Sequence, residues 1–382
     1  MTKKIFIAGS GGIGEAAALL LREWSEFETE IFLGDVAEEN LRRGKDFVTA
    51  DSSKNSRVET ILMAKEGSNE VMNRAFESCD VLLDCSPGSQ APRMARFALD
   101  FKMHYANLTE YVAETDEITS FASGAETGFI LQTGLAPGFI NVLAMSLYRK
   151  FVAEFENEKV EKIGMKVGAL TAHAHAPHFY GFTWSPIGVA TEYVKNARVI
   201  RKYQITEMPA LSERETIVIG GRTYEADLTS GGAADLPEFF TDKAKSLDYK
   251  TLRHVGHYEW VQRAIHEFPN DAELPDKVLA KFLREVPAVE DDFVLVHASV
   301  DGFDKNGTRR MLEKAFFVEP TLINGNHLRA IQTTTAAPLC EGAMMLLTGK
   351  YKGVVLQSQI EPQIFLNGKF VGKIYQNNFG KD

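Results

Sequence analysis

Cysteine is scarce in this chain. There are three among 382 residues, an odd number. Disulfide frameworks use paired cysteines and zinc knuckles use closely spaced ones, so neither is expected. We interpret Cys79, Cys85 and Cys340 as reduced thiols and expect a cytoplasmic protein.

Long apolar runs and dense basic clusters are also missing. No apolar stretch approaches the roughly 18 residues of a membrane-spanning helix. Lys and Arg together number 42 against 52 Asp and Glu, a net charge of −10. Nucleic acids and anionic membranes attract clustered basic residues, so neither is an expected partner. The first apolar run is short and turns glycine-rich at Gly9, which indicates a strand instead of a signal peptide.

The first 138 residues alternate between short apolar runs and helical patterns. Several runs are apolar throughout, which is typical of a parallel sheet covered on both faces. The pattern predicts a doubly wound Rossmann sheet in an α/β protein. The expected strands are residues 4–8, 30–35, 80–85, 104–108 and 129–133, and the expected helices are residues 15–24, 37–48, 71–78, 92–101 and 115–123.

The pattern changes after Gly138. Longer alternating runs, mostly without intervening helices, predict an α+β second domain with a largely antiparallel sheet. A length of 382 residues also favours two domains over one core. A Met- and Leu-rich helix at residues 335–347 is expected to pack back on the first domain. The other expected elements are strands at residues 162–167, 216–219, 293–300 and 311–318, and helices at residues 186–194 and 260–267.

Residues 9–14 read Gly-Ser-Gly-Gly-Ile-Gly and lie between the first expected strand and an alanine-rich helix. Asp35 ends the second strand, 35 − 14 = 21 positions after the last glycine. This combination predicts a dinucleotide site. Gly9 permits a tight turn, Gly11 leaves room for a pyrophosphate, and Gly14 lets helix and strand approach closely. The helix N-terminus faces the phosphates, and Asp35 accepts hydrogen bonds from the adenosine ribose.

Asp35 also bears on the choice of cofactor. A carboxylate there repels a 2′-phosphate, and Val36 and the two residues after it include no arginine, so NAD is favoured over NADP. Arg42 and Arg43 keep NADP open as the alternative. Two later turns are expected at the ligand edge of the sheet, one against the adenine and one near the nicotinamide ribose. The expected cofactor-binding residues are Gly9, Ser10, Gly11, Gly12, Ile13, Gly14, Asp35, Val36, Asp51, Ser52, Cys85, Ser86 and Pro87.

These motifs resemble the saccharopine dehydrogenase family, including its saccharopine reductase and lysine 6-dehydrogenase branches. The likeness covers nearly the whole chain, and its specific parts are the Trp-Ser-Pro and Lys-Thr-Leu-Arg segments. The segments that carry it are residues 9–14, 104–110 (His-Tyr-Ala-Asn-Leu-Thr-Glu), 134–139 (Gly-Leu-Ala-Pro-Gly-Phe), 182–186 (Phe-Thr-Trp-Ser-Pro), 197–200 (Ala-Arg-Val-Ile) and 249–253 (Tyr-Lys-Thr-Leu-Arg).

The resemblance implies a split architecture. A Rossmann domain of residues 1–138 is completed by about residues 329–382, and residues 139–328 form a substrate-binding and dimerisation domain. It also implies hydride transfer between the nicotinamide and the nitrogen-bearing carbon of an amino acid, lysine-derived or similar. A small amino-acid-like substrate and a homodimer are therefore expected.

Such a substrate carries a carboxylate and an amine, so its site needs a fixed cation and a weak base. Arg253, in the family-like segment, is the first candidate for the cation because a guanidinium holds a carboxylate bidentately. Arg198 is the second. Each has an alternative reading, a surface ion pair for Arg253 and packing at the domain interface for Arg198.

Two residues compete for the acid/base role. Glu110 follows the fifth strand, where half burial would raise its pKa. His257 titrates near neutrality unaided. An exposed glutamate and a satisfied loop histidine remain the alternatives. Asn107, Thr109 and Trp184 are expected to line the substrate site.

Three histidines, His173, His175 and His178, lie close together in the sequence. No Cys, Asp or Glu in that segment supplies a fourth ligand, and the reaction of the family needs no metal, so no metal site is expected. Two other functions remain open. One is a lysine 6-dehydrogenase or a carboxynorspermidine dehydrogenase-type enzyme, which acts on a carboxylated polyamine precursor. The other is a dinucleotide-binding sensor or scaffold without catalysis.

Overall fold

The computed structural model describes residues 2–50 and 57–376. The chain forms two compact units, each described here by itself. The Rossmann unit contains Met1–Phe139, Thr321–Leu328 and Gln332–Ile374. The second unit contains Ile140–Pro320, Arg329–Ile331 and Tyr375–Asp382.

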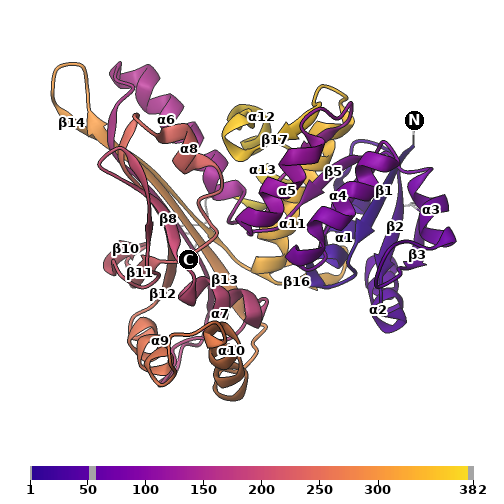
Figure 1. The fold of residues 1–382 in the computed structure, drawn as a ribbon, viewed down its shortest axis with the longest axis horizontal. Helices are drawn as coiled ribbons and strands as arrows, with labels where there is room; N and C mark the ends of the chain where they lie inside the picture. Colours follow the sequence, from indigo (N-terminus) through magenta and orange to yellow (C-terminus); the bar gives the residue numbers. More distant parts are fainter. Residues whose placement is uncertain (1, 51–56, 377–382) are drawn as a thin grey trace. The chain divides into compact units, whose positions relative to one another are not determined.

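A seven-stranded sheet forms the centre of the Rossmann unit, in the order β17-β6-β5-β4-β1-β2-β3 (Figure 1). All neighbouring strands are parallel, which confirms the predicted doubly wound sheet. Strand β17 pairs with β6, so the C-terminal part of the chain returns to this sheet. The strands are β1 (Lys3–Ala8), β2 (Thr29–Asp35), β3 (Arg57–Leu62), β4 (Val81–Asp84), β5 (His104–Asn107), β6 (Gly128–Ile130) and β17 (Gly353–Val355).

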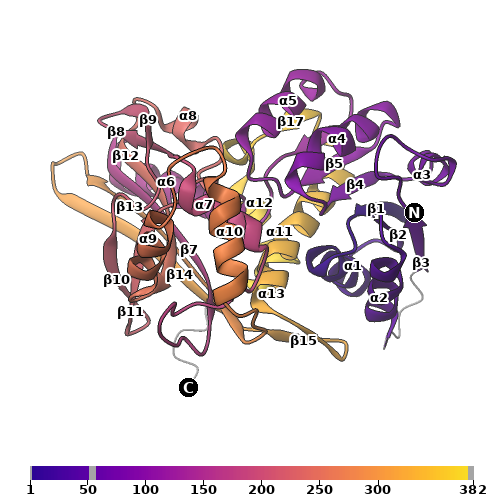
Figure 2. The same ribbon diagram turned by 60° about the horizontal axis from the view of Figure 1, so that its bottom comes forward.

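Helices cover both faces of this sheet, with α4 and α5 on one side and α1 and α2 on the other (Figure 2). On the first side Phe6, Tyr105 and Phe129 of the sheet share a core with Phe76 and Met94. The helices and short elements of the unit are α1 (Gly12–Trp24), α2 (Glu38–Thr49), α3 (Glu70–Phe76), η1 (Gly88–Gln90), α4 (Ala91–Asp100), α5 (Val112–Ala122), β15 (Thr321–Ile323), β16 (Asn326–Leu328), α11 (Ala330–Leu347, whose first two residues belong to the second unit), η2 (Gln357–Gln359), α12 (Pro362–Leu366) and α13 (Val371–Ile374).

The second unit is built on an eight-stranded sheet in the order β10-β11-β12-β7-β13-β14, with β8 and β9 attached beside β12. Only the β12–β7 pair is parallel, so the prediction of a largely antiparallel sheet is confirmed. The strands are β7 (Val160–Thr171), β8 (Ala197–Arg201), β9 (Gln204–Met208), β10 (Glu215–Ile219), β11 (Arg222–Leu228), β12 (Ala244–His254), β13 (Asp292–Phe303) and β14 (Arg309–Val318).

Helices α7, α9 and α10 of this unit share a core of Val189, Tyr193, Trp260, Val278 and Phe282. The helices are α6 (Phe139–Phe155), α7 (Pro186–Val194), α8 (Leu236–Phe240), α9 (His257–His266) and α10 (Leu274–Glu285).

Sequence reasoning missed several elements, among them the helices α6, α8 and α10 and the strands β3, β8, β9, β11, β12 and β17. Helix α6 is apolar on most sides, so a helical period is weak in it. Strand β12 carries buried charged side chains and so lacks a regular apolar alternation. Helix α6 and strand β12 therefore depend on tertiary burial more than on a local pattern.

Candidate functional site

The glycine-rich loop connects β1 to α1 with a geometry that requires glycine at two positions. Gly9 has a φ of +100°, and a Cβ there would lie 2.7 Å from the carbonyl oxygen of Cys85. At Gly14 a Cβ would lie 1.9 Å from the carbonyl oxygen of Gly9. A Cβ on Gly11 would meet no protein atom within 4 Å. Gly9 and Gly14 are therefore required by the fold, whereas the open space at Gly11 suits a ligand that approaches the backbone.

Asp35, the last residue of β2, is held rigidly beside this loop. Its Oδ2 accepts a hydrogen bond from the amide of Ser10 at 2.9 Å. Its Oδ1 accepts one from the amide of Ala37 at 2.9 Å and one from Nδ2 of Asn40 at 3.2 Å. Since a carboxylate oxygen has two lone pairs, Oδ2 retains capacity for a ligand hydroxyl.

A cavity of about 450 Å³ opens at the carboxyl ends of β1, β2, β3 and β4. Ligands of open parallel sheets bind at this edge, where the strand order reverses, here between β1 and β4. The lining residues that the sequence predicted are Gly9, Gly11, Asp35, Val36, Cys85, Ser86 and Pro87. Sequence reasoning missed Asn40, Met63, Lys65, Gln90, Arg93 and Met94. Ser10, Gly12, Ile13 and Gly14 support the loop behind this lining, and Asp51 and Ser52 lie outside the described residues.

Arg93 of α4 fixes the segment that follows β3. Its guanidinium donates to the carbonyl oxygens of Ala64 at 2.7 Å, Lys65 at 2.8 Å and Gly67 at 2.5 Å. A sequence signal for Met63 and Lys65 existed, because residues that follow a strand at this edge face the ligand. The missed β3 hid that signal.

Arg43 of α2, one of the two arginines that keep NADP open, is bound within the protein. It donates to the Glu15 carboxylate at 2.9 Å, to the Ser10 carbonyl at 3.1 Å and to the Asn40 side chain at 3.2 Å. Its side chain is about half exposed. Glu15 thus balances the charge of Arg43.

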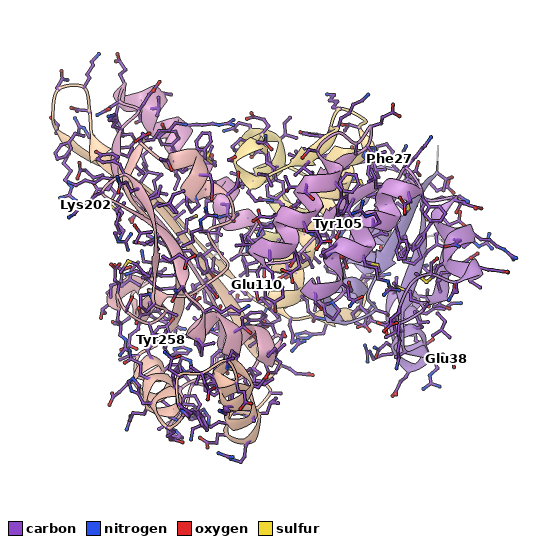
Figure 3. All side chains as sticks on the ribbon, in the orientation of Figure 1. Phe27, Glu38, Tyr105, Glu110, Lys202 and Tyr258 are labelled. Carbon is purple, nitrogen blue, oxygen red and sulfur yellow. The ribbon has the colours of Figure 1, made fainter. Side chains whose placement is uncertain are left out.

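The end of β5 carries three of the predicted substrate-site residues. Asn107 is buried, and its Oδ1 accepts the amide of Gln132 at 2.7 Å. Thr109 is buried and accepts the amide of Tyr111 at 3.3 Å. Glu110 is partly exposed in the loop after β5 (Figure 3). The structure brings these three together at the ligand edge of the Rossmann sheet, although they do not line the cavity described above.

Arg253, the predicted cation for a substrate carboxylate, is deeply buried in the second unit, with 1% of its surface exposed. Its guanidinium binds the carboxylate of Glu192 at 2.8 Å and the hydroxyl of Tyr193 at 2.6 Å, and it packs on the ring of Tyr180. Burial raises the pKa of Glu192 to about 7, and the positive charge of Arg253 opposes that rise. Arg253 therefore has an internal carboxylate partner, and its role as the cation for a substrate carboxylate stays a prediction.

His257 is also buried, at the start of α9. Its Nδ1 contacts the carbonyl oxygen of His178 at 2.6 Å and its Nε2 the hydroxyl of Tyr193 at 3.0 Å. Burial, with the nearby charge of Arg253, holds the pKa of His257 well below its usual value. Both ring nitrogens are occupied, and the ring is neutral at physiological pH. The satisfied-histidine alternative therefore describes His257 better than an acid/base role.

The other two predicted residues of the second unit are less enclosed. Arg198 of β8 forms an ion pair with Glu238, in which both side chains are about 40% exposed. Trp184 is partly buried just before α7 and packs on the core of that helix. A Cβ at Gly188 would lie 2.4 Å from its ring, so the glycine makes room for the indole.

The histidine segment forms no metal centre in the described chain. His173 and His175 are exposed, and His178 is partly buried with Nδ1 against the Tyr180 carbonyl at 3.1 Å. Across residues 2–50 and 57–376, no three His, Cys, Asp or Glu side chains gather closely enough to hold an ion. In the same ranges, no helix combines the length and apolar character that crossing a bilayer requires.

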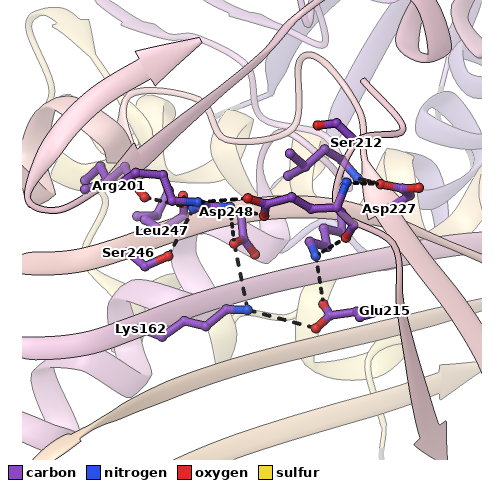
Figure 4. Close-up of polar contacts among 12 residues, drawn as sticks. Lys162, Arg201, Ser212, Glu215, Asp227, Ser246, Leu247 and Asp248 are labelled. Carbon is purple, nitrogen blue, oxygen red and sulfur yellow. Dashed lines mark hydrogen bonds and ion pairs between the residues drawn. The ribbon is translucent and has the colours of Figure 1, made fainter. Parts of the chain in front are cut away.

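A network of charged side chains lies on the sheet of the second unit (Figure 4). Lys166 and Lys250 are opposite each other on β7 and β12, both are almost fully buried, and both approach Oε1 of Glu215, at 3.1 and 3.4 Å. Asp248 binds Arg201 at 3.0 Å. The two buried lysines therefore share one carboxylate, which lowers the cost of burying their charges on the sheet.

Comparisons with known proteins place the chain in a family. The saccharopine dehydrogenase C-terminal domain matches residues 134–368, and the saccharopine dehydrogenase NADP binding domain matches residues 5–131. The chain belongs to the saccharopine dehydrogenase family. Members of this family are oxidoreductases that act on amino-acid substrates, and the second match supports a nicotinamide dinucleotide as cofactor.

Two curated relatives of this saccharopine dehydrogenase family member are alpha-aminoadipic semialdehyde synthases. The mitochondrial protein of Rattus norvegicus is 24% identical over 206 residues, which are 52% of this chain and 21% of that protein. The protein of Arabidopsis thaliana is 24% identical over 262 residues, which are 58% of this chain and 24% of that protein. The chain therefore spans only about a quarter of the length of these relatives.

Two solved structures share the fold over nearly the whole chain. Saccharopine dehydrogenase (L-Glu forming) of Saccharomyces cerevisiae has a TM-score of 0.73 at 14% identity and covers 98% of each chain. Homospermidine synthase of Legionella pneumophila, solved with NAD, has a TM-score of 0.68 at 11% identity and covers 99% of this chain and 91% of its own. At such identities these structures establish the fold alone.

Proposed function

We propose that this chain is an NAD-dependent oxidoreductase that transfers a hydride between the cofactor and the nitrogen-bearing carbon of an amino-acid amine or imine. One observation carries the proposal: the Asp35 carboxylate lies in the cavity beside the glycine loop and retains an acceptor site for a ribose hydroxyl. The family supplies the class of substrate.

The residues of the cavity suit a dinucleotide from end to end. Backbone amides in the first turn of α1 have no acceptors inside the helix and would hold the diphosphate above Gly11. Asp35 would hold the adenosine ribose, with the segment after β3 beside the adenine. When bound, the nicotinamide supplies or accepts the hydride. Side chains of this protein would bind the substrate and transfer its proton.

The preference for NAD follows from charge. A 2′-phosphate would stand against the Asp35 carboxylate, which is fixed in place by three hydrogen bonds. Arg43, on the helix that follows Asp35, is balanced by Glu15 at 2.9 Å. Repulsion between a phosphate and an immobile carboxylate therefore disfavours NADP.

We assign the acid/base role to Glu110, which is partly exposed after β5 and lies next to the buried Thr109. Asn107 and Thr109 are proposed to line the substrate site from the same strand. In the second unit Trp184 is proposed as an apolar wall. Arg198 is proposed as the cation for a substrate carboxylate, because a half-exposed ion pair exchanges partners at little cost.

The test is a two-stage experiment on the purified protein. Calorimetry first measures the Kd values of NAD⁺, NADH, NADP⁺ and NADPH, and NAD(H) is expected to bind more tightly. Formation of NADH is then followed optically with lysine, saccharopine, other lysine-derived secondary amines and carboxylated polyamine precursors.

Replacement of Glu110 by Gln is expected to reduce kcat by about 100-fold or more while the Kd of NADH is unchanged. Tight cofactor binding without turnover of any amine would instead support a sensor or scaffold. Tighter binding of NADPH than of NADH would overturn the cofactor assignment. A homodimer is also proposed, and light scattering at several protein concentrations tests it.

A further inference from the structure

Asp84, the last residue of β4, is a buried carboxylate directly behind the cavity lining. It is 2% exposed. Its Oδ1 accepts the amide of Ser86 at 2.9 Å and also the Ser86 hydroxyl, and its Oδ2 accepts the hydroxyl of Tyr105 at 2.9 Å. Tyr105 lies in the Rossmann unit (Figure 3). Among the described residues, no Lys, Arg or His forms an ion pair with Asp84.

The groups around this carboxylate leave its charge uncompensated. In register with it are Ala8 on β1 and the neutral Asn107 on β5. The titratable neighbours are Tyr105 and the thiol of Cys85, and burial raises the pKa of both. On α4 the nearest cation, Arg93, is held by the carbonyl oxygens of residues 64–67.

Burial raises the pKa of Asp84 to about 6, while the hydrogen bonds from Ser86 and Tyr105 oppose the rise. The Asp84 carboxyl group therefore changes from neutral to negatively charged as the pH rises through about 6. The effect of this charge on a bound cofactor depends on which part of the cofactor lies beside Asp84.

The topology places Asp84 at the nicotinamide half of the site. Asp35 and the residues after β3 form one end of the cavity, the glycine loop its middle, and Cys85, Ser86 and Pro87 after β4 the other end. An adenosine held by Asp35 and a diphosphate held at Gly11 direct the remaining half of a dinucleotide toward β4. The nicotinamide ring is a cation when oxidised and neutral when reduced.

We propose that Asp84 sets the relative affinity of this site for the oxidised and reduced cofactor, because its buried carboxylate favours the cationic ring over the neutral one. Ser86, which lies between the carboxylate and the cavity, is the positioning residue that holds this charge in place. The inference rests on the proposed function, since it needs a nicotinamide cofactor in the cavity.

The size of the effect follows from Coulomb's law. Two unit charges roughly 8 Å apart at an effective dielectric constant of about 30 change the affinity ratio by about tenfold. For a two-electron cofactor, tenfold corresponds to about 30 mV in the potential of the bound pair. By reciprocity, NAD⁺ binding lowers the pKa of Asp84 and expels a proton, whereas NADH binding does not.

The experiment measures the Kd of NAD⁺ and of NADH for the whole chain between about pH 5 and pH 8, by calorimetry and NADH fluorescence. The ratio of the NADH Kd to the NAD⁺ Kd is expected to rise about tenfold with pH, with a midpoint near the pKa of about 6. Calorimetry in buffers of different ionisation enthalpy is expected to show proton release on NAD⁺ binding near the midpoint.

Three variants separate this role from a merely structural one. Asp84→Asn keeps the shape of the side chain and removes its charge. The ratio of the NADH Kd to the NAD⁺ Kd in this variant is expected to be independent of pH and equal to the low-pH value of the original protein. Tyr105→Phe removes a hydrogen bond that lowers the pKa of Asp84, so the midpoint is expected to move to higher pH. Asp100→Asn, an exposed position at the end of α4, is the matched control and is expected to match the original protein.

A pH-independent ratio in the original protein, or a pH dependence that persists in Asp84→Asn, would overturn the inference and leave the proposed function intact. Failure to bind either cofactor at any pH would overturn the proposed function instead. If Asp84→Asn does not fold, two other measurements test the inference. They are the midpoint of the pH dependence of the Kd ratio in Tyr105→Phe and the proton release on NAD⁺ binding to the original protein.

Discussion

The backbone amide of Ser10 donates a hydrogen bond of 2.9 Å to Oδ2 of Asp35, 25 positions further along the chain. This bond joins the loop after β1 to the carboxylate that ends β2. The loop proposed to hold the diphosphate and the carboxylate proposed to hold the ribose are therefore fixed relative to each other. Such preorganisation reduces the entropy lost on binding.

Replacement of Asp35 by Ala is expected to weaken NADH binding by about 10- to 100-fold, because hydrogen bonds from the ribose to a charged acceptor are lost. Binding of NADPH should change much less, since the repulsion of its 2′-phosphate disappears at the same time. Calorimetry with both cofactors measures the two Kd values. Asp46→Asn on the exposed side of α2 is the control, and an Asp35→Ala protein that still prefers NADH as strongly as before would contradict the assignment.

Alanine at Gly9 and at Gly11 should have opposite consequences. Gly9→Ala forces a Cβ to 2.7 Å from the Cys85 carbonyl oxygen at a φ of +100°, which is expected to lower the free energy of unfolding by about 1–3 kcal/mol. Gly11→Ala meets no protein atom, so stability is preserved while the dinucleotide Kd rises at least about tenfold. Denaturant titration and calorimetry on both variants test this, and a Gly11→Ala protein with undiminished affinity would exclude a diphosphate above this loop.

The buried pair of Glu192 and Arg253 predicts a large stability effect. Glu192→Gln leaves the guanidinium of Arg253 as an uncompensated charge in the interior, so the free energy of unfolding is expected to fall by about 3–5 kcal/mol. Glu238→Gln, which breaks the half-exposed pair with Arg198, should cost no more than about 1 kcal/mol. Chemical denaturation of both variants measures the difference, and equal costs would show that the internal pair is not a structural element.

Asp84 gives the stability of the protein a specific dependence on pH. Its pKa is raised from 3.8 to about 6 by folding, so the folded state binds more protons between these values and loses stability as pH rises through them. Asp84→Asn does not titrate, and it is expected to be more stable than the original protein above about pH 6, by on the order of 1–3 kcal/mol. Thermal melts at about pH 4 and pH 7.5 check this, and the advantage should vanish at the lower pH.

The local part of the site was readable from the sequence. The glycine loop, its distance from Asp35 and the turn at Cys85, Ser86 and Pro87 all depend on a strand followed by a turn, which neighbouring residues encode. A comparable signal existed at Asp84, a carboxylate that ends an apolar run as Asp35 does. The sequence analysis assigned a role to Asp35 on this signal and assigned none to Asp84.

The remote part of the site was not readable. Arg253 lies in a family-like segment and looks free in the sequence, but its carboxylate partner is 61 positions away on α7. His257 titrates near neutrality in water, but the carbonyl of His178 and the hydroxyl of Tyr193 occupy both of its nitrogens. Arg93 and Lys65 reach the cavity only because α4 and the segment after β3 meet in space.

The sequence by itself determined the doubly wound sheet, the glycine-rich loop, the carboxylate at the end of β2 and the family, because backbone conformation and strand order follow from patterns within a few dozen residues. Only the tertiary structure decided which charged groups are neutralised internally and which face a ligand. Desolvation and ion pairing depend on side chains that are distant in the sequence, as Glu192 beside Arg253 and Tyr105 beside Asp84 illustrate. The chemistry of a buried group is set by the neighbours that folding brings to it.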